Sequence, residues 1–279
     1  MTDLLQALVL GLIQGLTEFL PISSSAHLAI FPKFFGWEDP GAAFTAVIQI
    51  GTELAVVIYF WRDIWNIAGG WLRGLVKPAA RTTLEWRMGW FVIIGSLPIV
   101  VLGIALKDAI ESDFRNLWVI ATMLIVMGVV LGICDRLGRL DRKIEDLTVR
   151  HAVLFGLAQA MALIPGVSRS GATISMGRAL GYDRAAATRY AFLLAIPAVV
   201  GAGLFQLPEI PGGDNAYGVG ATILATVVSF VVGISVIHWL LQYVSKHSYT
   251  PFVIYRIGLG TLVLALLATG TIAAGTTVG

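Results

Sequence analysis

The hydrophobic positions of the chain form long continuous blocks rather than the short alternating runs of a water-soluble domain. A helix needs about 20 apolar residues to cross a bilayer. Six blocks reach this length, and they lie near 41–61, 88–106, 116–134, 188–207, 218–243 and 252–273. The pattern therefore predicts six transmembrane helices.

Two further apolar blocks are too short to cross a membrane. Residues 4–20 end just before Pro21, and residues 151–164 end just before Pro165. As a helix rising 1.5 Å per residue, the second block spans only about 21 Å, against roughly 30 Å of hydrocarbon. Each block is followed by a polar turn and a further short block, 26–36 and 171–182. We predict two re-entrant helix–loop–helix hairpins, because irregular backbone at membrane depth is tolerated inside protein or beside water.

The distribution of basic residues orients this layout in the membrane. Most lysines and arginines lie on one side, at the base of the second hairpin and in the loops 62–87, 135–150 and 244–251. Basic loops mark the cytoplasmic side of a membrane protein. We therefore expect these loops to be cytoplasmic and the other side, with both termini, to face outward.

The two short blocks share a motif. Gln14 recurs as Gln159, 145 residues later, with one glycine (Gly11 and Gly156) and two serines aligned at the same offset. One hairpin plus three spans is an odd-numbered unit, so two such units must lie inverted in the membrane, as in many transporter folds. We predict a single membrane domain, 1–279, made of inverted repeats at about 1–140 and 150–279.

Composition agrees with an all-α integral membrane protein. The chain is 57% hydrophobic and 13% charged, outside the usual range of soluble domains. We therefore expect membrane lipids as partners. The formal net charge of only +2 argues against nucleic acid as a partner. The sequence leaves the oligomeric state open, and an oligomer is compatible with it.

Ionisable and hydroxyl side chains gather at the two hairpin turns. An ionisable residue inside the membrane is a functional candidate by default, and a helix N-terminus with hydroxyls and an arginine suits phosphate. The alternative is that the serines only cap helices and that the histidine only packs. Their combination favours a phosphate site, with candidates Gln14, Glu18, Ser23, Ser24, Ser25, His27, Ser168, Arg169, Ser170, Gly171 and Thr173.

Two of these segments resemble a known family. Residues 14–27 (QGLTEFLPISSSAH) and 165–173 (PGVSRSGAT) closely resemble the two signature motifs of the bacterial undecaprenyl-pyrophosphate phosphatases, the bacitracin-resistance proteins. Residues 47–51, the span end at 59–62 and residues 251–256 also look like family sequence. The resemblance implies hydrolysis of a polyprenyl pyrophosphate lipid, C55-isoprenyl pyrophosphate, to the monophosphate and inorganic phosphate. It further implies a multi-pass protein of the bacterial plasma membrane whose active site opens to the outer face.

The resemblance also implies a divalent cation, Mg²⁺ or Ca²⁺. The family's first motif often begins with Glu, and here Gln14 takes that place. A neutral amide supplies no second carboxylate, so we expect Glu18 to bind the metal together with phosphate oxygens of the substrate.

The expected mechanism gives each hairpin a role. Arg169 and nearby amides hold the phosphates, with Gln14 and the hydroxyls as further substrate contacts. Ser24 is the candidate nucleophile with His27 as its base, and Glu18 orients His27 or holds the metal. The competing mechanism uses a metal-activated water, with Ser24 only donating a hydrogen bond.

Two other classes of function remain to be weighed. A lipid-phosphate transporter or flippase would also have inverted repeats and broken helices, and it could coexist with hydrolysis. The density of acid, serine and histidine within ten residues favours hydrolysis. A structural scaffold would have no use for Glu18, His27 and Arg169 at membrane depth.

Overall fold

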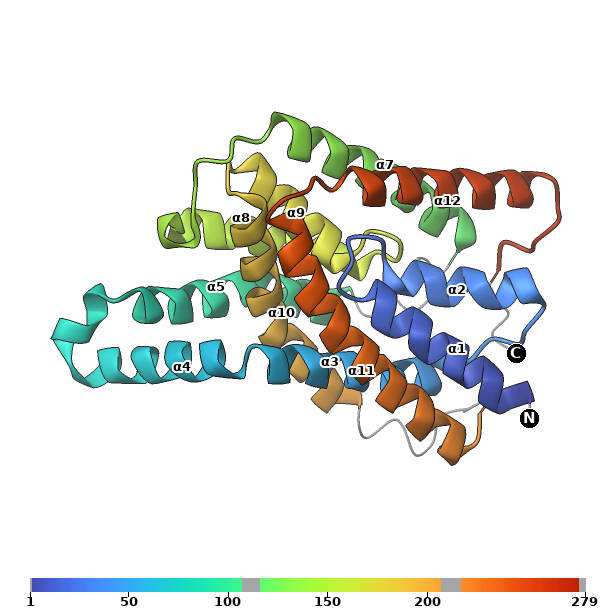
Figure 1. The fold of residues 1–279 in the computed structure, drawn as a ribbon, viewed down its shortest axis with the longest axis horizontal. Helices are drawn as coiled ribbons and strands as arrows, with labels where there is room; N and C mark the ends of the chain where they lie inside the picture. Colours follow the sequence, from blue (N-terminus) through green and yellow to red (C-terminus); the bar gives the residue numbers. More distant parts are fainter. Residues whose placement is uncertain (1, 107–115, 207–216, 276–279) are drawn as a thin grey trace.

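The computed structural model describes residues 2–106, 116–206 and 217–275. Every regular element in these residues is a helix. The predicted all-α class is therefore confirmed (Figure 1). The α-helices are α1 Thr2–Thr17, α2 Ser24–Phe35, α3 Gly41–Tyr59, α4 Trp61–Val76, α5 Leu84–Ala105, α7 Leu117–Leu137, α8 Val149–Ala160, α9 Arg169–Ala179, α10 Arg184–Gln206, α11 Val219–Val244 and α12 Thr250–Ala268. Short 3₁₀ turns are η1 Pro78–Thr82, η3 Ile144–Asp146 and η4 Met161–Leu163.

Several of these helices are long and apolar enough to cross a membrane. Among the described residues, α5, α7, α11 and α12 each pass this test, and α3 and α4 pass it as a pair bent by 66°. The chain is thus a multi-pass membrane protein. The expected span near 188–207 falls in α10, which opens with arginines and does not pass the same test; residue 207 lies outside the described part.

The predicted loop at 62–87 is wrong, because most of it is the helix α4. Its glycines let α4 lie directly on α5: an added Cβ at Gly70 would clash with Glu85, and one at Gly74 with the ring of Trp86. Trp71 reaches across the pair to Trp90, with ring centroids 5.6 Å apart. Small residues and aromatics therefore make a packed helix from a stretch that its basic residues suggested was a loop.

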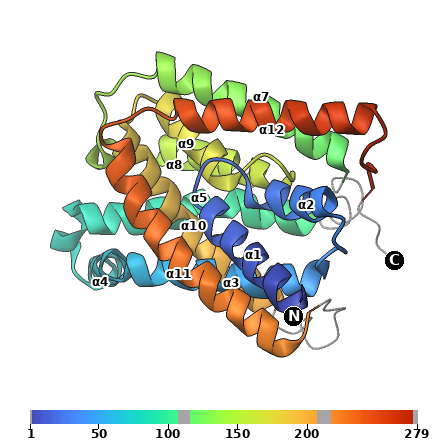
Figure 2. The same cartoon turned by 45° about the vertical axis from the view of Figure 1, so that its right-hand side comes forward.

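The two short predicted blocks do form helix–turn–helix units, α1–α2 and α8–η4–α9 (Figures 1 and 2). Each first helix packs on a long helix from the other half of the chain. A Cβ on Gly11 in α1 would meet the backbone of Ala225 in α11, and one on Gly156 in α8 would meet the backbone of Gly95 in α5. Glycine at these positions allows the close approach that fixes where each turn lies.

Candidate active site

The turns of the two hairpins have the same unusual backbone. Ser23 precedes α2 with φ 76° and ψ 98°, and Ser168 precedes α9 with φ 70° and ψ 116°. They are the non-glycine residues with positive φ in the described chain. Such conformations cost about 1–3 kcal/mol each and tend to occur at functional sites. Two equivalent strained turns therefore point to a shared purpose.

Each of these serines caps its helix in the same way. The Ser23 hydroxyl accepts a hydrogen bond from the Ala26 amide, and the Ser168 hydroxyl accepts one from Gly171. Each also lies 3.1 Å from the hydroxyl of the serine two residues on, Ser25 or Ser170. Capping satisfies an otherwise unpaired amide at the helix start. The Gly171 amide, expected to bind phosphate, is thus already engaged by Ser168.

The two turns meet through Glu18 and Arg169. Arg169 Nη2 donates to Glu18 Oε1 at 2.7 Å, and both side chains are largely buried. Ser170 Oγ also donates to the Leu20 carbonyl at 3.0 Å. The predicted acid and the predicted arginine, from opposite halves of the sequence, are therefore in direct contact.

Glu18 is the centre of this polar cluster. Its second oxygen, Oε2, accepts hydrogen bonds from Ser24 Oγ at 2.5 Å and from Gln14 Nε2 at 3.1 Å. The same Gln14 nitrogen donates to Thr52 Oγ1 of α3, also at 3.1 Å. The serine, the acid and the arginine thus form one connected chain of hydrogen bonds, in which the Ser24 proton points at a carboxylate.

His27 does not take the position expected of it. Its Nδ1 lies 2.7 Å from the Ser23 carbonyl and its Nε2 lies 2.7 Å from the Tyr255 hydroxyl. A carbonyl only accepts, so Nδ1 carries a proton. The ring is buried and stacks on Tyr255 at 5.5 Å. The structure therefore pairs Ser24 with Glu18 rather than with His27, and His27 holds the carbonyl of the strained Ser23 turn.

The other candidates differ in what they can offer a ligand. Ser25 is exposed beside the turn, whereas Thr173 is fully buried and donates within its own helix to the Arg169 carbonyl at 2.8 Å. Gln159, the counterpart of Gln14, is fully buried with no protein partner for its amide among the described residues. The Thr173 hydroxyl is therefore already used within α9, and the Gln159 amide has no contact with the cluster among the described residues.

Arg256 donates hydrogen bonds to the backbone of both turns. It is fully buried, and its guanidinium donates to Pro21 of the first turn at 3.0 Å and to Gly166 and Val167 of the second at 2.9 and 3.0 Å. Further bonds reach the carbonyls of Met123 and Leu124 in α7. Every acceptor is a backbone carbonyl, so Arg256 acts as a clamp between the two hairpins.

Four residues at the site were not among the sequence candidates: Thr52, Glu53, Tyr255 and Arg256. A signal existed for two of them, because Glu53 and Arg256 are ionisable residues within apolar blocks, which marks a functional candidate. Thr52 and Tyr255 carry no such signal. Only the packing of α3 and α12 against the first hairpin brings them to it.

Comparison with known proteins agrees with this arrangement. The family model described as "Bacitracin resistance protein BacA" matches residues 7–262. The chain belongs to the bacitracin resistance protein family. The matched segment includes both strained turns, Arg256 and the Tyr255–His27 pair, so the whole cluster falls within the part that defines the family.

Three full-length relatives are named undecaprenyl-diphosphatase, one of them with the number 2. A protein of a Nocardioides species called undecaprenyl-diphosphatase is 69% identical over 274 residues, which cover 98% of this chain and 100% of the relative. One from Micrococcus luteus with the same name is 57% identical, covering 97% of this chain and 99% of the relative. One from Agrobacterium fabrum, undecaprenyl-diphosphatase 2, is 56% identical, covering 97% and 98%.

Proposed function

We propose that this protein is an undecaprenyl-diphosphatase, which hydrolyses C55-isoprenyl pyrophosphate to the monophosphate and inorganic phosphate. The observation that carries the proposal is the Ser24–Glu18–Arg169 chain between the two turns. It combines a hydroxyl, a base and a phosphate-binding cation within hydrogen-bond reach. The name shared by full-length relatives supports the same reaction. The motif resemblance implies its place in recycling a lipid carrier of cell-wall synthesis.

In the proposed reaction the Ser24 oxygen attacks the terminal phosphorus. Its proton passes to Glu18 Oε2, which already accepts that hydrogen bond at 2.5 Å. The bond to the bridging oxygen breaks and releases the isoprenyl monophosphate. Water then cleaves the phosphoserine: its hydroxyl joins the phosphorus, Glu18 returns its proton to the Ser24 oxygen, and the second proton of the water leaves with the inorganic phosphate. Arg169 stabilises the negative charge on the transferred phosphoryl oxygens through its two-pronged guanidinium.

Protein side chains at this site would supply only some of the ligands of a divalent cation, Mg²⁺ or Ca²⁺. No cluster of three or more His, Cys, Asp or Glu side chains occurs among the described residues. Glu18 is the expected carboxylate ligand, and Mg²⁺ is commonly held by one or two carboxylates together with substrate phosphates. When bound, the cation would neutralise charge on the phosphates.

The topology we propose has six spans, with two re-entrant hairpins entering from opposite faces as inverted repeats. Two observations support it. Ser23 and Ser168 have matching positive φ values, and the first helix of each hairpin packs on a long helix from the other half of the chain, α1 on α11 and α8 on α5. The basic segments, which are α4 with η1 and the connections 135–150 and 244–251, then lie on the cytoplasmic side, and the site opens to the outer face of the plasma membrane.

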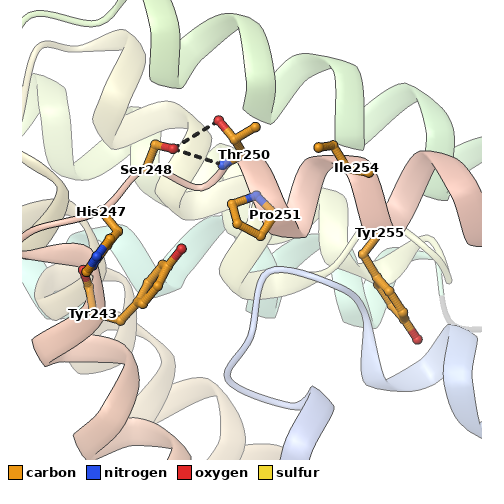
Figure 3. Close-up of a pocket in the computed structure, with 7 residues that line it drawn as sticks. All are labelled: Tyr243, His247, Ser248, Thr250, Pro251, Ile254 and Tyr255. Atoms are coloured by element: carbon orange, nitrogen blue, oxygen red, sulfur yellow. Dashed lines mark hydrogen bonds between the residues drawn. The ribbon is translucent and has the colours of Figure 1, made fainter.

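The isoprenyl tail needs an apolar path away from the cluster. A groove of about 610 Å³ follows the start of α12, and Tyr255, the partner of His27, stands at one end of it (Figure 3). Pro251 and Ile254 line it between Tyr255 and the loop before α12. We propose that the first isoprene units lie in this groove beside the lipid.

The deciding experiment measures inorganic phosphate released from C55-isoprenyl pyrophosphate by the purified protein in detergent with Mg²⁺ or Ca²⁺. We expect release by the wild type and loss in Glu18→Ala, because that change removes the group joining Ser24 to Arg169. A folded wild type that releases no phosphate would contradict the proposal and favour lipid transport.

Ser24 and a metal-activated water differ in where the phosphoryl group goes. We expect rapid quenching with β-³²P-labelled substrate to yield a phosphorylated peptide containing Ser24, absent in Ser24→Ala. Ser25→Ala, which alters the exposed neighbouring hydroxyl, serves as the control and should keep the label. Turnover by Ser24→Ala at the wild-type rate would exclude the serine and leave the water mechanism.

Tyr255→Phe should lower kcat about 3- to 10-fold, since it removes one hydrogen bond worth about 0.5–1.5 kcal/mol while keeping the ring stacked on His27. Steady-state phosphate release measures the effect. Tyr243→Phe is a suitable control, because it removes a hydroxyl at the opposite end of the same groove from Tyr255 (Figure 3). An unchanged kcat in Tyr255→Phe would mean that this bond does not support the reaction.

A further inference from the structure

Glu53 is an acid in α3 that the reaction described above does not use. Gln49, Thr52 and Glu53 are three and four residues apart and so share one face of the helix. That face meets the first hairpin, because Thr52 Oγ1 accepts from Gln14 Nε2 at 3.1 Å, and the same nitrogen donates to Glu18 Oε2. Glu53 is therefore next to the residue that touches the Glu18 cluster.

The charges around Glu53 are those of the reaction site. Arg169 and Glu18 are the charged groups that act electrostatically on its carboxylate. Its hydrogen-bond donor is the neutral amide of Gln49, at 3.3 Å. Arg169 is already paired with Glu18, and no ion pair to Glu53 occurs within the described ranges. Glu53 is a partly buried carboxylate without a matching cation of its own.

This arrangement is unfavourable for an anionic substrate unless a cation joins it. The two carboxylates carry a formal charge of −2, and the arginine that faces them returns only +1. A diphosphate brought between them adds more negative charge at close range in a poorly screened interior. The carboxylates and the arginine together carry a net charge of −1. A divalent cation bound between the carboxylates and the phosphate would make the net charge of these protein groups and the cation positive.

Position 14 explains why a second acid is needed elsewhere. Gln14 is a neutral amide rather than a carboxylate, and it turns its amide nitrogen, which cannot bind a metal, toward Glu18. We infer that Glu53 supplies from α3 the second carboxylate ligand of the divalent cation, in place of an acid at position 14. The inference rests on the proposed function, because the substrate phosphates complete the coordination.

The test measures metal binding without turnover. Mn²⁺ affinity is determined by electron paramagnetic resonance on the purified full-length protein in detergent, with methylenediphosphonate as a diphosphate that cannot be hydrolysed. We expect Glu53→Gln to weaken Mn²⁺ binding at least tenfold. Glu145→Gln, at an exposed acid in η3 away from the hairpin turns, is the matched control and should bind as the wild type does.

A double variant separates a ligand from a merely structural residue. If Glu53 replaces an acid at position 14, then Gln14→Glu combined with Glu53→Gln should recover most of the lost Mn²⁺ affinity. Equal affinity in Glu53→Gln and wild type, a wild type that binds no Mn²⁺, or a double variant as weak as Glu53→Gln would each overturn the inference. Phosphate release by the wild type, measured in parallel, tests the proposed function independently of these results.

Discussion

Replacing Arg169 with alanine is expected to lower kcat/KM for C55-isoprenyl pyrophosphate about 10²- to 10³-fold, equivalent to about 2.7–4 kcal/mol of transition-state stabilisation. The guanidinium is the first side chain of α9 and lies 2.7 Å from Glu18, where a transferred phosphoryl group would carry its charge. Its removal takes away the hydrogen-bond donor to the phosphate. It also leaves the Glu18 carboxylate without the cation that it pairs with. Steady-state phosphate release gives the measurement.

Two further variants show whether activity depends on bidentate hydrogen bonding by the guanidinium or only on its positive charge. Arg169→Lys keeps the charge but loses two-pronged binding, so its activity should fall between those of the wild type and the alanine variant. Arg189→Ala breaks a similar ion pair, with Asp63, that is half exposed and away from the turns. It should leave kcat/KM nearly unchanged. An undiminished kcat/KM in Arg169→Ala would remove Arg169 from the site.

The placement of the hairpins could be predicted from sequence because the evidence is local. Apolar blocks too short for a span, ended by proline and followed by serines, specify a helix, a turn and a second helix whatever the rest of the chain does. The contact between Glu18 and Arg169, 151 residues apart, followed once both turns were placed at the same depth. Inverted topology and the number of spans stay predictions.

Side-chain partners at the site could not be predicted, because they depend on packing between distant helices. Ser24 and His27 are close in sequence, yet the turn directs one to Glu18 and the other to Tyr255, 228 residues away. The sequence predicts which face of its helix Glu53 occupies. It does not predict which other helix packs against that face. The helix α4 was missed for a similar reason, since its stability comes from contacts between its glycines and α5.

Arg256→Met should have the largest effect on stability, lowering the free energy of unfolding by at least about 3 kcal/mol. The arginine is fully buried and satisfies five backbone carbonyls, three of them in the two turns. A buried acceptor left without a donor costs about 1–3 kcal/mol, and methionine replaces the length of the side chain but none of its donors. Thermal unfolding in detergent measures the loss.

The same change should abolish turnover even in the protein that remains folded, because Arg256 joins the Pro21 turn to the Gly166–Val167 turn and so sets the distance between Glu18 and Arg169. Arg178→Met is the matched control. Arg178 is equally buried and bonded to carbonyls, but it clamps the other end of α9 to α7 through Asp135. Assayed well below both melting temperatures, Arg178→Met should therefore keep most of its kcat while Arg256→Met loses it. If both variants keep their kcat, Arg256 stabilises the fold without positioning the two turns for catalysis.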